Sequence, residues 1–174
     1  MSEAQASGGA TGPADAAAVP LVVDVDGSLI TGDTFMEATL RLVAADPASL
    51  LRLPAWWFGG RANLKARVAA RVGFGRGEMA FNEAVLAAIR SARAAGRPVY
   101  LASGGATRHI AEIAEEVGDL SGIYTSDGNT NLTGAAKAER LVAQFGEGGF
   151  DYIGNEGRDL AVWARARHAI AVGG

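Results

Sequence analysis

Short hydrophobic runs alternate with amphipathic stretches along most of the chain. Each run is too short for a typical helix and predicts a buried strand of a parallel sheet. The predicted strands span residues 21–23, 99–102, 122–125, 150–153 and 169–172. The stretches between them carry apolar residues at helical spacing and predict helices at 81–95, 107–117, 135–145 and 160–166. Because strands and helices alternate, we expect an α/β fold with a doubly wound parallel sheet.

One segment, residues 34–80, breaks this alternation. It lies between the first strand and the next crossover helix, and its pattern is helical throughout. Thr34 and Glu37 have the spacing of a capping box, which predicts a helix start at this point. The expected helices span residues 34–45, 47–58 and 62–72. A helical insert after the first strand stands beside the carboxyl end of the sheet, so we expect a small helical cap over a crevice there.

The apolar sequence Trp56-Trp57-Phe58 ends the second helix of this insert. We interpret it as the hydrophobic core of the cap. The alternative is a surface that docks on a membrane or on a partner protein. The basic residues of the next helix, Lys65, Arg67 and Arg71, favour that alternative.

Two acidic residues, Asp24 and Asp26, follow the first strand. Alternate side chains on an extended strand point the same way, so both face one crevice at the carboxyl edge of the sheet, where open α/β sheets bind ligands. Two carboxylates ~4 Å apart repel by roughly 4 kcal/mol at an effective dielectric of ~20. A divalent cation such as Mg²⁺ commonly offsets that repulsion. A simple turn at Asp26-Gly27 is the alternative, but it leaves Asp24 unexplained.

Three further polar clusters follow later elements. Ser103-Gly104-Gly105 ends a strand before a helix, where it forms either a plain turn or a phosphate-binding turn. Taken singly, Lys137 reads as a surface lysine and Asp159 as a helix cap. In series with the two acids, however, the clusters predict phosphoryl transfer. A carboxylate attacks phosphorus, a second acid moves protons, a lysine neutralises charge, and the acidic loop 155–159 completes a Mg²⁺ site.

Composition limits the other possibilities. A chain of 174 residues predicts one domain, which we expect to begin at residue 20 after a flexible leader of residues 1–19. The net charge of -3 argues against a nucleic-acid partner. The absence of cysteine excludes disulfides and a thiolate nucleophile. The sequence has no apolar run long enough to span a membrane and no signal peptide, so we expect a cytoplasmic protein.

The order of these motifs resembles the haloacid dehalogenase-like (HAD) phosphohydrolase superfamily. Asp24-Val25-Asp26-Gly27-Ser28 matches the first motif of that family, Asp-x-Asp-x-Thr/Ser. The resemblance implies a Rossmannoid HAD-like domain over residues 20–174, with the small helical cap of the phosphoserine phosphatase-like branch. It also implies a Mg²⁺-dependent phosphatase that acts on a small phosphorylated metabolite through an aspartyl-phosphate.

The resemblance also implies a role for each matched residue. Asp24 would be the nucleophile, Asp26 the general acid and base, and Lys137 the third catalytic residue. The implied substrate-binding residues are Ser28, Ser103, Gly104 and Lys137, and the implied Mg²⁺ ligands are Asp24, Asp26, Asn155 and Asp159.

Asn155 departs from the family pattern, which has an acid at this position. The loss of one charge weakens metal binding by roughly ten- to a thousand-fold, unless Glu156 takes its place. The alternative function is therefore a catalytically weak or inactive HAD-like regulatory or docking module. A receiver domain does not fit, because receivers place adjacent acids after the first strand and the phosphate-accepting aspartate after a later one.

Residues 131–138, 150–154 and 159–163 look like the HAD-like domains fused to UbiA-type membrane prenyltransferases. This closer resemblance implies fusion or association with such a prenyltransferase, and a location at the inner face of the membrane. The residues themselves do not identify the substrate. A phosphorylated prenyl or sugar intermediate is implied by the fusion alone.

Overall fold

The computed structural model describes residues 18–126, 131–155 and 157–173. Its centre is a five-stranded parallel sheet in the order β3-β2-β1-β4-β5. The strands are β1 (Leu21–Asp24), β2 (Val99–Ala106), β3 (Gly122–Ser126), β4 (Asp151–Gly154) and β5 (His168–Ala171). This arrangement confirms the predicted α/β fold with a doubly wound parallel sheet. Most of the predicted leader, and Glu156, lie outside the described residues.

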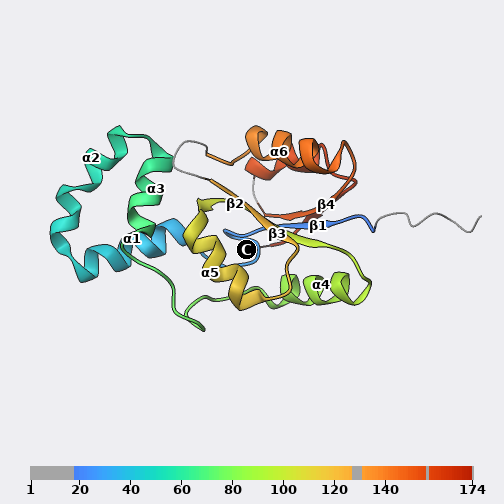
Figure 1. Cartoon of the computed structure of the whole chain (residues 1–174), viewed down its shortest axis with the longest axis horizontal. Coiled ribbons are helices and arrows are strands. Elements are labelled where there is room, and N and C mark those ends of the chain that lie inside the picture. Colours follow the sequence, from blue (N-terminus) through green and yellow to red (C-terminus); the bar gives the residue numbers. More distant parts are fainter. Residues whose placement is uncertain (1–17, 127–130, 156, 174) are drawn as a thin grey trace, which may run out of the picture.

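Helices cover both faces of the sheet (Figure 1). The helices α4 (Glu83–Ala94) and α5 (Thr107–Val117) pack on one face, and α6 (Ala135–Phe145) and α7 (Leu160–Trp163) pack on the other. Side-chain alternation along β1 assigns its residues to these two cores. Val23 packs on the side of α4 and α5, whereas Val22 packs on the side of α6 and α7.

Strand β2 is longer than the sequence predicts. It continues through Ser103, Gly104 and Gly105 to Ala106 instead of ending at Ala102. The pairing with β3 shifts register between Ser103 and Ala106, which marks a bulge in this part of the strand. The two glycines are therefore part of an irregular strand end, and α5 begins directly after it.

The residues between β1 and α4 form a group of helices at one end of the molecule (Figure 1). They are α1 (Thr34–Ala45), the 3₁₀ helix η1 (Pro47–Leu51), α2 (Leu53–Phe58) and α3 (Arg61–Ala69). We call this group the cap. It has its own small core, to which α1, α2 and α3 contribute Ala38, Leu42, Trp56, Leu64 and Val68. The cap meets the sheet near the end of β2, which α3 contacts.

Three details of the cap correct the sequence predictions. The N-cap residue of helix α1 is Asp33, whose side chain accepts from Met36 N, and not Thr34 as the capping-box spacing predicts. The backbone N–H that a capping box would use, that of Thr34, donates to Asp26 instead. The second helix is broken at Arg52 into η1 and α2, since Pro54 has no N–H to continue the helical ladder. Of the three aromatic residues at 56–58, only Trp56 lies in the cap core.

One face of α5 holds the chain segment that returns from the cap. Arg108 Nη1 donates to Ala69 O at 2.8 Å, and His109 Nε2 lies 2.7 Å from Val72 O. Further along the helix, Glu112 accepts from Phe74 N at 2.8 Å and Glu116 accepts from Gly77 N at 3.0 Å. The cap is therefore fixed to the core by side chains that follow one another along a single helix.

Asp151 anchors a charged cluster at the start of β4. Its carboxylate is buried and accepts hydrogen bonds from Arg97 and from both Nε and Nη2 of Arg167, each of the latter at 2.8 Å. His168 Nδ1 lies 2.9 Å from the same carboxylate. Burial alone would raise the pKa of Asp151, but these partners outweigh it and lower the pKa to about 2.

We expect the Asp151 cluster to make the free energy of unfolding fall at low pH. A carboxyl whose pKa is lower in the folded than in the unfolded state stabilises the fold at pH values above the unfolded pKa, which is about 4. For Asp151 this stabilisation is about 2 kcal/mol, and it is lost as the pH falls through the folded pKa of about 2. Asp151→Asn should lower the free energy of unfolding at neutral pH and flatten its decline between pH 4 and 2. Urea unfolding across this range is the measurement, with exposed Glu83→Gln as control. Parallel curves for the parent and Asp151→Asn would contradict this account.

Candidate active site

Asp24 ends β1, the central strand, at the point where the neighbours β2 and β4 lead to opposite edges of the sheet. Such a reversal point is where open α/β sheets bind ligands. Asp24 has the same side-chain parity as Val22, so it faces α6. Only 5% of Asp24 is exposed. The sequence thus places a carboxylate in a buried position, where its charge requires a partner.

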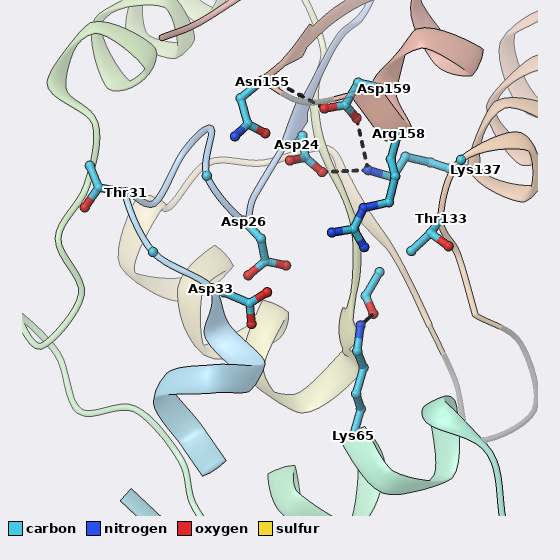
Figure 2. A pocket seen from close by; sticks show the side chains of 14 residues that line it. Asp24, Asp26, Thr31, Asp33, Lys65, Thr133, Lys137, Asn155, Arg158 and Asp159 are labelled. Atoms are coloured by element: carbon cyan, nitrogen blue, oxygen red, sulfur yellow. Dashed lines mark hydrogen bonds and ion pairs between the residues drawn. The ribbon is translucent and has the colours of Figure 1, made fainter. Parts of the chain in front are cut away.

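Lys137, in the first turn of α6, provides that partner. Its Nζ donates to Asp24 Oδ1 at 2.6 Å and to Tyr152 Oη at 2.9 Å, and it lies 3.7 Å from Asp159 Oδ1. Tyr152 Oη donates in turn to Asp159 Oδ1 at 2.8 Å. All four side chains are buried, so these bonds form one water-shielded chain from Asp24 to Asp159. Figure 2 shows the contacts of Lys137 with Asp24 and Asp159.

Burial and neighbouring charges have opposing effects on the pKa of Asp24. Burial raises the pKa of Asp24 to about 6, although Lys137 opposes the rise, and the nearby charges of Asp159 and Asp26 add to it. Such a carboxylate is poorly solvated and held in one orientation by Lys137. Both properties suit a nucleophile that must approach an anionic phosphate.

Asp26 lies beside Asp24 but has different partners. Its Oδ1 accepts from Thr34 N at 2.7 Å, and its Oδ2 accepts from Ser103 Oγ at 3.0 Å. Ser103 Oγ also accepts from Gly105 N at 2.8 Å. The Ser103 hydroxyl therefore orients Asp26. The neighbouring Gly104 lines the cavity. The phosphate-binding role predicted for Ser103 stays a prediction.

Asn155 lies against the turn that follows β1. The φ of Gly27, +77°, favours glycine, and a Cβ there would lie 2.2 Å from Asn155 Nδ2 and displace that side chain. Ser28 is fully buried, and its Oγ lies 3.3 Å from both Asp24 Oδ2 and Asn155 Oδ1. Ser28 thus lies behind the site and brings these two oxygens together.

The oxygens of Asp24 and Asn155 fit a magnesium ion. Mg²⁺ prefers hard oxygen ligands and commonly takes one or two carboxylates while keeping several waters. Asp159 fits a different role, because its Oδ1 accepts from Tyr152 and its Oδ2 accepts from Asn155 N at 3.0 Å. It positions the loop that carries Asn155, and its predicted metal contact stays a prediction. Within the described part of the chain, no three acidic or histidine side chains gather as a metal site.

These residues surround one cavity of about 320 Å³ (Figure 2). Six of the predicted site residues line it, namely Asp24, Asp26, Gly104, Lys137, Asn155 and Asp159. The predicted residues Ser28 and Ser103 lie behind its wall, since both are fully buried. The polar clusters that the sequence places after separate strands and at the start of a helix therefore lie around one cavity.

Sequence reasoning missed five polar residues that line the cavity, Thr31, Asp33, Lys65, Thr133 and Arg158. Lys65 comes from α3 of the cap and donates to Gly104 O at 2.6 Å, and burial lowers its pKa. In Figure 2 it enters the cavity from the side opposite Asp24 and Lys137. A lysine on a basic helix gives no signal of this role. Tyr152 was also missed, although it shares the side-chain parity of Asp24 on the neighbouring strand.

Comparison with known proteins gives one sequence relative and several similar structures. No family model matches the chain. The uncharacterized protein y4nM of Sinorhizobium fredii is 34% identical over 155 residues, which are 89% of this chain. The match covers 30% of that protein, so the chain spans under a third of the length of this relative.

Similar solved structures include a phosphoserine phosphatase in apo form, with a TM-score of 0.56 and 16% identity over 86% of this chain and 83% of that one. A substrate-bound phosphoserine phosphatase complex has a TM-score of 0.57 and 14% identity over 89% and 92%. A HAD family hydrolase from Salmonella enterica serovar Typhi has a TM-score of 0.58 and 16% identity over 86% and 61%. Together with the parallel sheet and the helices inserted after β1, these likenesses show that the chain has the HAD-like fold.

Proposed function

We propose that the chain is a Mg²⁺-dependent phosphomonoester hydrolase that acts through an aspartyl-phosphate. One observation carries the proposal: a buried carboxylate, Asp24, is held by Lys137 at 2.6 Å and lies with a second acid, Asp26, on one cavity. The HAD-like fold supports it. Among the similar structures is a phospho-aspartyl intermediate analogue of phosphoserine phosphatase.

In the first step an Asp24 oxygen attacks phosphorus, and the bond between phosphorus and the ester oxygen breaks. Asp26 gives its proton to the departing oxygen, so the leaving group departs as a neutral alcohol. Ser103 and Thr34 hold the Asp26 carboxyl through its two oxygens, which fixes its direction toward the cavity. Lys137 stabilises the negative charge that builds up around Asp24.

In the second step water attacks the aspartyl-phosphate. Asp26, now ionised, takes the proton from that water, and phosphate leaves as the Asp24 carboxylate re-forms. Asp24 and Asn155, with the backbone carbonyl of Asp26, would hold Mg²⁺ in this site. When bound, Mg²⁺ supplies positive charge that neutralises the phosphate oxygens. The cavity of about 320 Å³ suits a small phosphorylated metabolite.

The test is phosphate release from a small aryl phosphate by the full chain, with and without Mg²⁺. We expect release that depends on Mg²⁺ and stops when a chelator removes it. If purified, folded protein binds Mg²⁺ but releases no phosphate from a panel of phosphomonoesters, the hydrolase proposal fails.

Asn155 favours a second candidate, a regulatory or docking module in which this site is weak or inactive. An amide offers the metal an oxygen but no charge, and the predicted Asp159 contact is engaged elsewhere. The two functions differ in what restoring the charge would do, which gives a direct test.

We expect Asn155→Asp to raise Mg²⁺ affinity by roughly ten- to a thousand-fold, because a second carboxylate would face the ion. Mg²⁺ titration by calorimetry measures this directly. Asn82→Asp is the matched control, since Asn82 caps α4 and does not line the cavity, and aspartate caps equally well. An unchanged affinity in Asn155→Asp would show that this side chain does not face the metal. Turnover that appears only in Asn155→Asp would favour the regulatory module.

A further inference from the structure

The cap exposes large apolar side chains that its own core does not use. Six of the eight exposed large apolar residues in the described part of the chain belong to the cap. Leu50 and Leu51 in η1 and Trp57 and Phe58 in α2 form what we call the outer cap surface. Phe58 is 90% exposed and Leu51 85%, the two largest values among these residues.

The outer cap surface is concentrated at one place. Helices η1 and α2 contact each other and lie at the end of the cap farthest from the sheet (Figure 1). Folding of the cap does not require these side chains, because Trp56 fills its core and Arg71 lies 4.4 Å above the Trp56 ring. A cluster of exposed apolar residues on an otherwise well-packed domain indicates an interaction surface.

Charge distinguishes the cap from the rest of the chain. Residues 34–69, which form the cap, contain five basic and two acidic side chains, a net charge of +3, whereas the whole chain has -3. The remainder is therefore strongly acidic. Arg61 follows α2 after two glycines, and Arg52, which lies between η1 and α2, is paired with Asp46 at 2.9 Å. An anionic surface would attract the cap and repel the remainder, which orients the molecule with α2 toward that surface.

We propose that the outer cap surface docks on anionic lipid bilayers. Tryptophan, phenylalanine and leucine insert at the boundary between headgroups and acyl chains, and arginines beside them contact lipid phosphates. The segregation of charge favours lipid over a protein partner, because it matches an extended anionic plane. The proposal is independent of the hydrolase function, since none of the four apolar residues of the outer cap surface lines the cavity.

The test is flotation of the full chain with vesicles of phosphatidylcholine alone or mixed with phosphatidylglycerol. We expect binding to the mixed vesicles that weakens at high salt. The double variant Leu51→Ser with Phe58→Ser should reduce the bound fraction by at least about tenfold. Leu160→Ser is the matched control, because Leu160 is 63% exposed but lies in α7, outside the cap.

Failure to bind mixed vesicles, or equal binding by the double variant and the parent, would overturn the proposal. So would a self-associated parent that the same double variant makes monomeric in sedimentation, since the surface would then join two copies. All the substituted residues are exposed, so the variants should fold. Circular dichroism and thermal unfolding confirm this before flotation.

Discussion

Asp24→Asn should reduce phosphate release to background, a loss of roughly 10⁴-fold or more, as is typical when a nucleophile is removed. The amide has almost the same shape as the carboxyl but cannot attack phosphorus. The substitution also leaves the buried Lys137 ammonium with one carboxylate neighbour, Asp159 at 3.7 Å, so we expect a folded protein with a lower free energy of unfolding. The measurement is Mg²⁺-dependent turnover of an aryl phosphate, together with thermal unfolding.

Asp33→Asn is the matched control for Asp24→Asn. Asp33 also lines the cavity, but its side chain caps α1 by accepting from Met36 N, and asparagine caps equally well. We expect Asp33→Asn to keep most of the turnover. Substantial turnover by Asp24→Asn would show that another group attacks phosphorus.

Lys137→Met should affect both stability and activity. It leaves the buried carboxylates of Asp24 and Asp159 without the ammonium that lies between them, which costs roughly 3–5 kcal/mol of unfolding free energy. Loss of the same charge from the reacting oxygens should lower turnover by about 10²–10³-fold. Chemical unfolding and steady-state kinetics measure the two effects separately.

Two further variants test the reason for the effect of Lys137→Met. Lys65→Met removes the other lysine of the cavity, which is less buried and donates to a backbone carbonyl, so its cost in stability should be much smaller. Adding Asp24→Asn to Lys137→Met should recover part of the lost stability, because one uncompensated charge is removed. Strict additivity of the two substitutions would contradict the proposed coupling.

The sheet and its flanking helices could be predicted because their signals are local and agree with one another. The apolar run at residues 21–23 is buried on both faces, and α5 and α6 have the predicted bounds. The cap was harder to predict. Its helical pattern identified α1, but Pro54 breaks the next helix, and Trp57 and Phe58 point outward. Hydrophobicity alone does not tell a core residue from one on an interaction surface.

The site could be predicted as a set of strand ends, since parallel strands bring their carboxyl ends to one edge. The bonds within it could not. Ser103 turns its hydroxyl to Asp26, and Tyr152 lies between Lys137 and Asp159, because the bulge in β2 and the packing of α6 decide these directions. Lys65 reaches the cavity only through the placement of α3, which no local pattern encodes.

The central claim is that Asp24 carries the phosphoryl group during turnover. The most direct test is acid quenching of the enzyme during steady-state hydrolysis of an aryl phosphate, followed by peptide mass spectrometry. The account predicts a phosphoryl adduct on the peptide that contains Asp24, and no such adduct in Asp24→Asn. Turnover by the parent without any phosphorylated enzyme and with inversion of configuration at phosphorus would contradict it, because direct attack by water inverts once whereas two successive displacements give net retention.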